Sequence, residues 1–178
     1  MKLLFLTGNK GKLSEARQIL GDSVKVDNKK IDLPEIQSTS VQEVIEEKLK
    51  EAFKIVKQPV FCEDTGVYIK NMNNFPGALI KFYMESLGLA KIAKQNAGSS
   101  VYAETIIGYH DGKNIYFFSG KIIGNIPEKP KGKGFGWDPI FVPKGYTKSF
   151  AQISPEEKNR ISMRGKAFTK FKKFLESK

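Results

Sequence analysis

The chain has 178 residues, of which 40% are hydrophobic and 28% charged, so it has enough apolar material for one packed domain and lacks the composition of a disordered protein. Its 30 Lys and Arg outnumber 19 Asp and Glu, giving a formal net charge of +11. Most of this excess lies in the second half, where we expect an acidic partner to bind.

Cysteine and histidine counts exclude several classes of site. The single cysteine, Cys62, cannot form an internal disulfide and favours a reducing compartment. The single histidine, His110, excludes a His-rich zinc site, and we assign it no role. The sequence contains no apolar run near the roughly 18 residues of a membrane span. It also begins without a cleavable signal pattern, so we expect a cytoplasmic protein that binds no membrane.

The first half predicts two units of strand, polar loop and helix. Residues 3–6 form a short apolar strand, and a helix follows with apolar positions from Leu13 to Leu20 and a stop at Gly21. Residues 41–56 show the clearest amphipathic pattern in the chain. A second buried strand at 59–62 then runs into Glu63-Asp64-Thr65-Gly66, which we expect to be a polar loop.

The second half is antiparallel in character. Two β-rich runs, 101–109 and 115–123, flank Asp111-Gly112, which is a hairpin signal. A Gly-, Pro- and Lys-rich stretch over 124–134 follows, and the chain closes with an aromatic helix. We therefore predict a single α/β domain over residues 1–178, with a mixed central β-sheet flanked by helices and two lobes with a substrate cleft between them.

The loop at residues 7–12, TGNKGK, has the composition of a phosphate-binding segment. Its glycines allow close backbone approach, its amides lie at a predicted helix N-terminus, and Lys10 and Lys12 add positive charge. It is not a Walker A loop, because its glycines are too close together and Leu13 replaces the magnesium-binding Ser or Thr. The alternative is an ordinary capped helix with exposed lysines.

Two adjacent carboxylates, Glu63 and Asp64, come directly after a predicted buried strand. Like charges repel, so this arrangement is easier to explain if a cation binds there, and carboxylate oxygens favour Mg²⁺ or Mn²⁺. Glu35, in the segment IDLPE, is a third candidate acid. The alternative is a pair of solvated loop residues.

Two further segments are candidate parts of a binding site. GFGWDP, residues 134–139, places two aromatic rings between glycines, which suits stacking on a nucleobase, although such rings are commonly core. The basic segment KNRISMRGK, residues 158–166, leads into the last helix. It is either a general nucleic-acid-binding face or the wall of a cleft in which Lys158 and Arg164 hold a triphosphate or a base carbonyl.

Taken together, the segments TGNKGKL, CEDTG, FPGALIKFY, GFGWDPIF and EKNRISMRGKA resemble the inosine/xanthosine triphosphate pyrophosphatase family, in the family's order and over residues 7 to about 168. The resemblance implies hydrolysis of deaminated purine nucleoside triphosphates (ITP, dITP, XTP) to the monophosphate and pyrophosphate. It also implies magnesium as cofactor, a cleft between two lobes and a homodimer.

The resemblance assigns roles to individual residues. Asp64 would activate water and bind magnesium with Glu35, and Glu63 would support the metal site. The residues that would contact the substrate are Thr7, Gly8, Asn9, Lys10, Gly11, Lys12, Lys48, Thr65, Lys81, Phe135, Gly136, Trp137, Asp138, Lys158, Met163 and Arg164.

One position departs from the family pattern. The family reads Ser-His-Arg near the C-terminus, whereas this chain reads Ser162-Met163-Arg164, and a methionine cannot donate a hydrogen bond to a base carbonyl. One alternative is therefore a pyrophosphatase of broader or different nucleotide specificity. A remote alternative is a non-enzymatic nucleic-acid-binding protein, which explains the charge but not Glu63 and Asp64, so we expect no nucleic acid partner.

Overall fold

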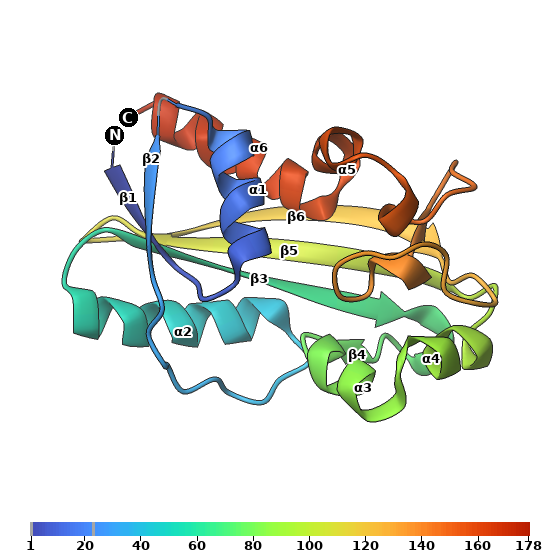
Figure 1. Cartoon of the computed structure of the whole chain (residues 1–178). Helices are drawn as coiled ribbons and strands as arrows, with labels where there is room; N and C mark the ends of the chain where they lie inside the picture. Colours follow the sequence, from blue (N-terminus) through green and yellow to red (C-terminus); the bar gives the residue numbers. More distant parts are fainter. Residues whose placement is uncertain (1, 23) are drawn as a thin grey trace.

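The computed structural model describes residues 2–22 and 24–178, which form a mixed β-sheet with helices on both faces (Figure 1). The sheet has seven strands in the order β2-β1-β3-β5-β6-β7, and β4 pairs with β3 beside this path. The strands are β1 (Lys2–Leu6), β2 (Lys25–Lys29), β3 (Val60–Ile69), β4 (Pro76–Gly77), β5 (Ser100–His110), β6 (Ile115–Asn125) and β7 (Val142–Pro143). The predicted α/β class is confirmed, and the division into two lobes stays a prediction.

The helices connect and cover these strands. They are α1 (Lys10–Leu20), α2 (Val41–Val56), α3 (Ile80–Leu87), α4 (Leu89–Gln95), α5 (Pro155–Ile161) and α6 (Met163–Glu176), with short 3₁₀ segments at Lys70–Met72, Asp138–Ile140 and Phe150–Gln152. Helices α1 and α6 lie on one face of the sheet and α2 on the other, while α3 and α4 lie near β4 (Figure 1).

The N-terminal unit folds as the sequence predicts. Strand β1 pairs in parallel with both β2 and β3, so α1 makes the crossover that parallel strands require. Asn9 caps α1 by accepting from the Lys12 amide at 3.0 Å, and Gly21 ends the helix at φ 70°, a conformation that favours glycine.

Strand β3 corrects one prediction. Glu63-Asp64-Thr65-Gly66 is not a loop, because β3 continues through it to Ile69 and pairs in antiparallel register with β5 from Val60 to Ile69. Polar residues are accommodated inside this strand because Glu63 and Thr65 find hydrogen-bond partners in the buried layer. Helix α2 ends before this strand, as predicted.

The predicted hairpin is confirmed as β5 and β6, which pair antiparallel over their full length. Strand β6 continues to Asn125, two residues beyond the predicted strand, and so includes Gly124. Helix α6 packs very closely on β6 at Gly120, where a Cβ atom would overlap the backbone oxygen of Met163. Glycine at this point lets the C-terminal helix sit directly on the sheet.

Three apolar clusters form the core. The first lies between the sheet and α1 and α6, and the second is built around α3, α4 and Trp137. The third lies between the sheet and α2 and contains Cys62, which is fully buried as predicted. Within the described ranges, no helix is both long and apolar enough to cross a membrane.

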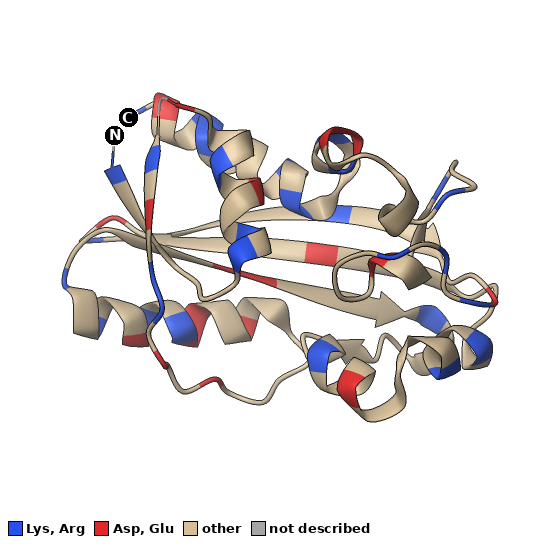
Figure 2. Cartoon of the chain, in the orientation of Figure 1, with Lys and Arg blue, Asp and Glu red and all other residues tan. Residues whose placement is uncertain are grey.

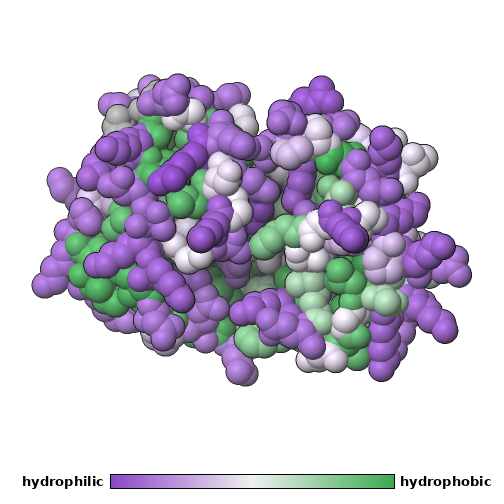
Figure 3. All heavy atoms as spheres, in the orientation of Figure 1, coloured by the Kyte–Doolittle hydropathy of each residue, from purple (hydrophilic) through white to green (hydrophobic). Residues whose placement is uncertain are grey.

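Basic residues are spread over the helices and loops and are not concentrated on one element (Figure 2). The outer surface is mostly hydrophilic, and it is hollowed between the part built on α1 and β2 and the part carrying the chain after β6 (Figure 3). The excess positive charge is therefore largely solvated surface.

Candidate active site

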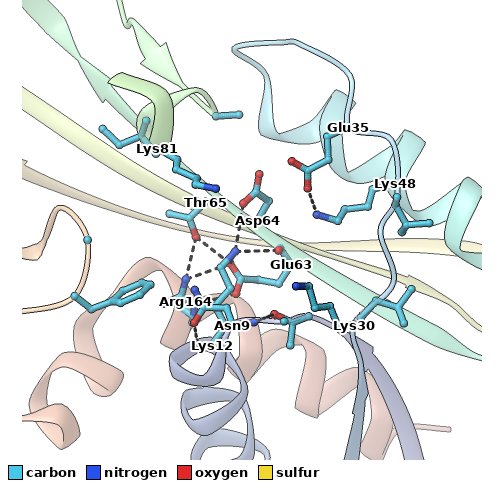
Figure 4. Close-up of a pocket in the computed structure, with 18 of the residues that line it drawn as sticks. Asn9, Lys12, Lys30, Glu35, Lys48, Glu63, Asp64, Thr65, Lys81 and Arg164 are labelled. Atoms are coloured by element: carbon cyan, nitrogen blue, oxygen red, sulfur yellow. Dashed lines mark hydrogen bonds and ion pairs between the residues drawn. The ribbon is translucent and has the colours of Figure 1, made fainter. Parts of the chain in front are cut away.

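A pocket of about 620 Å³ lies where the ends of β1 and β2, the middle of β3, helices α2 and α3 and the start of α6 meet (Figure 4). Fourteen predicted site residues line it: Thr7, Gly8, Asn9, Lys12, Glu35, Lys48, Glu63, Asp64, Thr65, Lys81, Phe135, Gly136, Trp137 and Arg164. Segments spread from residue 7 to residue 164 therefore converge on one site.

The loop between β1 and α1 forms one wall of the pocket. The Asn9 amide donates to Thr7 Oγ1 at 3.1 Å, and the Thr7 amide donates to the Lys29 carbonyl at 3.2 Å, which fixes the loop against β2. Lys12 extends into the pocket, whereas Lys10 and Gly11 are exposed and are not among the described residues that line it. The loop offers the pocket the N-terminal end of α1, which favours anions.

Glu63 and Asp64 point to opposite faces of the sheet, because side chains alternate along a strand. Glu63 lies on the α6 face and meets Arg164, whereas Asp64 lies on the α2 face with its side chain 25% exposed. Lys12 bridges the two: its Nζ lies 3.5 Å from Glu63 Oε1 and 3.3 Å from Asp64 Oδ1. Alternation therefore relieves the repulsion expected from the sequence.

Glu63 is held in a buried network. Its carboxylate accepts from Arg164 Nε at 3.0 Å, from Arg164 Nη2 at 3.3 Å and from Thr65 Oγ1 at 3.0 Å. Burial raises the pKa of the Glu63 carboxyl, but the charges of Arg164 and Lys12, together with the hydrogen bonds from Arg164 and Thr65, outweigh burial and lower that pKa to about 2. The Glu63 side chain has no exposed surface, so the structure places it as the partner of Arg164.

Arg164 is nearly saturated by this network. It donates to Glu63 through Nε and Nη2, to Thr65 at 3.4 Å, and to Glu15 through Nη1 at 2.7 Å. A guanidinium has five N–H groups. These contacts leave one Nη1 hydrogen of Arg164 for a ligand, among the partners that the structure describes.

Glu35 and Lys48 form an ion pair at the side of the pocket formed by α2 and the segment after β2 (Figure 4). Burial is the largest influence on the Glu35 carboxyl and raises its pKa, but the hydrogen bond from Lys48 and the charges of the surrounding lysines together outweigh burial, so the net shift of that pKa is downward. Burial likewise lowers the pKa of Lys48, but the hydrogen bond and charge of Glu35, together with the charge of Asp64, outweigh burial, so the net shift of that pKa is upward. Lys81, on α3, is exposed and lies 3.9 Å from Glu85.

The aromatic segment 135–137 is divided between the pocket and the core. Phe135 is 54% exposed and lines the pocket, and Gly136 adopts φ 56° beside it. Trp137 is 9% exposed and packs against Phe141 and Phe150, with ring centroids 5.4 and 6.1 Å away. The predicted two-ring platform is therefore one exposed ring and one ring held mainly by the core.

Three predicted substrate contacts lie behind the pocket wall. Asp138 and Lys158 pair with each other at 2.6 Å in a buried position, and Met163 is 1% exposed in the cluster around Trp137. None of the three is among the described residues that line the pocket. Burial raises the pKa of Asp138, and the charge of Lys158 offsets this only in part.

The structure also adds lining residues that the sequence did not single out. Lys30, Asp32 and Met84 line the pocket. Glu15 forms ion pairs with the lining residue Arg164 and with Lys158, whose Nζ lies 3.7 Å from Glu15 Oε1. The hollow thus combines an accessible carboxylate, several lysines, a helix N-terminus and an exposed ring. Such a site suits a polyanionic ligand that carries an aromatic group, and the class it defines is a nucleotide-binding α/β enzyme.

Comparison with known proteins supplies the family. The model of the Ham1 family matches residues 3–174, and the chain belongs to that family. It is 41% identical to the inosine triphosphate pyrophosphatase of Schizosaccharomyces pombe, covering 98% of this chain and 95% of the relative. It is 37% identical to the dITP/XTP pyrophosphatase of Thermococcus kodakarensis, covering 98% and 97%.

Solved structures agree with the fold. A HAM1 protein from Coxiella burnetii superposes with a TM-score of 0.87 at 24% identity, covering all of both chains. A second structure, titled nucleoside-triphosphatase / dITP/XTP pyrophosphatase, from Mycobacterium abscessus, has a TM-score of 0.75 at 25% identity, covering 96% of this chain and 98% of that one. The architecture is thus the one that Ham1 proteins share.

Proposed function

We propose that the protein hydrolyses deaminated purine nucleoside triphosphates (ITP, dITP and XTP) to the nucleoside monophosphate and pyrophosphate. The observation that carries this proposal is the pocket, in which the Asp64 carboxylate lies among Lys12, Lys48 and Lys81 and beside the loop 7–12. The relatives named inosine triphosphate and dITP/XTP pyrophosphatase, which match nearly the whole chain, support the choice of substrate.

Asp64 is the residue best placed to act as the base. Its side chain is accessible from the pocket, whereas the neighbouring Glu63 is fully covered and committed to Arg164. Asp64 would accept the proton of a water that attacks the α-phosphorus, and Lys12 would hold the carboxylate in place. The lysines of the pocket would balance the charge that develops on the leaving pyrophosphate.

The donor set fits magnesium. Asp64 and Glu35 offer carboxylate oxygens to one pocket, and Mg²⁺ is commonly held by one or two carboxylates together with water and substrate phosphates. Among the described residues, no group of three or more His, Cys, Asp or Glu is gathered as a metal site. We propose that Asp64 and Glu35 hold the ion and that Glu63 supports the site through Lys12. Bound magnesium would polarise phosphate oxygens.

Base recognition is proposed to involve stacking on Phe135 and the remaining N–H of Arg164. The 6-oxo group of hypoxanthine or xanthine can accept that hydrogen bond, whereas the amino group of adenine cannot, which costs adenine on the order of 1 to 3 kcal/mol. Met163 is buried in the core and offers no second donor. One alternative is therefore a pyrophosphatase of broader or different nucleotide specificity that reads the base through Arg164 alone.

The test is pyrophosphate release with Mg²⁺ from a panel of ITP, dITP, XTP, GTP and ATP. We expect ITP and XTP to exceed ATP in kcat/KM. A preference for ITP above about 100-fold, roughly 2.7 kcal/mol, would show that Met163 costs little selectivity. A smaller preference would favour the broader enzyme, and a protein that releases no pyrophosphate but shifts duplex DNA at low salt would overturn the enzyme assignment.

Two properties implied by the family resemblance belong to the same proposal. We propose that the protein acts as a homodimer in the cytoplasm. The fully buried thiol of Cys62, whose pKa burial raises to about 12, is compatible with a reducing compartment. Light scattering of the purified protein tests the dimer, because a single species at the 20.0 kDa monomer mass would contradict it.

A further inference from the structure

Among the residues that the structure describes, Lys30 is the one cation lining the pocket that has no carboxylate partner. The other four cationic side chains of the lining each lie within 4.0 Å of a carboxylate oxygen: Lys12 with Asp64, Lys48 with Glu35, Lys81 with Glu85, and Arg164 with Glu63. Among the described residues, the Lys30 amine forms neither an ion pair nor a hydrogen bond, although Lys30 lines the pocket. It can therefore bind an anion without first releasing a protein partner.

The fold fixes where the Lys30 side chain lies. Strand β2 pairs in parallel with β1, placing Lys29 opposite Leu6, and the Thr7 amide donates to the Lys29 carbonyl at 3.2 Å. Lys30, the next residue, is thereby set beside the loop 7–12. Its stem crosses the backbone at Gly8, where a Cβ atom would lie 3.1 Å from both Cγ and Cδ of Lys30.

The direction of the amine completes the argument. Figure 4 shows the Lys30 amine pointing toward the interior of the pocket, as do the amines of Lys12 and Lys48. Among the described residues, the lining contains five cationic side chains and four carboxylates, a formal excess of one positive charge. A polyphosphate entering between Lys12 and Lys48 would meet this unpaired ammonium beside the amides of loop 7–12.

We propose that Lys30 binds the phosphate chain of the nucleotide and the pyrophosphate that leaves, as a direct ammonium donor. The inference rests on the proposed function, which supplies the nucleotide as substrate. Its test does not depend on that function, because inorganic triphosphate carries the same phosphate groups without a base or sugar. Gly8 contributes to this binding, because its lack of a side chain leaves the space through which Lys30 reaches the pocket.

The experiment measures binding of inorganic triphosphate by titration calorimetry to the wild type and three variants. Lys30→Met keeps the stem and removes the charge, and we expect about tenfold weaker binding, the size of one hydrogen bond to a charged group. Lys30→Arg should restore affinity to within about threefold. Lys29→Met is the matched control, because Lys29 is the exposed neighbour on β2 and does not line the pocket among the described residues; it should change affinity by less than about twofold.

Two results would overturn the proposal. One is wild-type triphosphate affinity in Lys30→Met. The other is an equal loss of triphosphate affinity in Lys30→Met and Lys29→Met, which would indicate a general electrostatic attraction and no direct contact. Pyrophosphate release from ITP separates this failure from failure of the proposed function. If the wild type hydrolyses ITP and Lys30→Met binds triphosphate normally, only the role of Lys30 is wrong. If Lys30→Met loses triphosphate affinity but the wild type hydrolyses no nucleotide, the phosphate contact stands and the enzyme assignment fails.

Discussion

Replacing Glu63 with glutamine tests whether this carboxylate acts by holding Arg164 in a buried network. Glutamine keeps the size and one acceptor oxygen of Glu63 but removes its charge, while Arg164 stays buried with Glu15 as its remaining carboxylate. A pKa of about 2 for Glu63, against an ordinary value near 4.5, corresponds to about 3 kcal/mol of stabilisation at pH 7. We therefore expect Glu63→Gln to lower the free energy of unfolding by about 3 kcal/mol, at the lower end of the cost of breaking a buried ion pair.

The pH dependence gives the sharper test. Because the folded protein lowers the pKa of Glu63, this stabilisation is complete above about pH 5 and is lost as the pH falls from about 4.5 toward 2. Urea unfolding of the wild type and Glu63→Gln at several pH values should show a difference that shrinks over that range. The control is Asp64→Asn, the same chemical change one residue along the strand, with an expected loss below about 1 kcal/mol because Asp64 is partly solvated. A difference that is small at pH 7 or unchanged with pH would refute the reasoning.

Three further predictions concern the proposed general base Asp64, the buried position 163, and the contact between strand β6 and helix α6. Asp64→Asn should lower kcat for ITP by about 10² to 10⁴ while nucleotide binding changes little; unchanged turnover in the release assay would remove Asp64 from the mechanism. Met163→His should leave the ITP-to-ATP ratio of kcat/KM within about threefold and lower stability by about 1 to 3 kcal/mol, because position 163 is 1% exposed in the core. A large rise in that ratio would show that the side chain at 163 reaches the base. Gly120→Ala should cost at least about 1 to 3 kcal/mol in urea unfolding, because the new Cβ overlaps backbone atoms of α6 that cannot turn aside; wild-type stability would show that α6 can move away from β6.

Local sequence patterns were sufficient to predict the helices and strands that depend mainly on residues near one another in the chain. The 41–56 helix shows its apolar face at every turn, and the 101–123 hairpin has a turn sequence between two β-rich runs, so both were predicted near their observed bounds. Local pattern also predicts a loop at the polar residues 63–66, and this prediction is wrong. In β3 they pair with β5, and Glu63 finds its partner in Arg164, about a hundred residues away, and local sequence shows neither contact.

The motifs predicted which segments meet but not which side chains face the ligand. Asp138 and Lys158 come from two different motifs, and in the fold they neutralise each other behind the pocket wall. The sequence allows Trp137 to be either a stacking surface or core, and packing against Phe141 and Phe150 places most of the ring in the core. Burying an ion pair and a large ring requires tertiary partners, so orientation could not follow from motif composition alone.

Strand geometry explains why some residues of the candidate site can be predicted from the sequence and others are found only in the structure. On β3, alternation sends Glu63 to the α6 layer and Asp64 to the pocket, so two adjacent carboxylates take a structural and a chemical position. At the end of β2, nothing in the sequence separates Lys30, which follows the strand, from Lys29, its last residue, because both are lysines in a polar segment. Only the parallel register of β2 with β1, and the missing side chain at Gly8, bring Lys30 into the pocket. The pairing of strands thus selects one lysine of the two for the site.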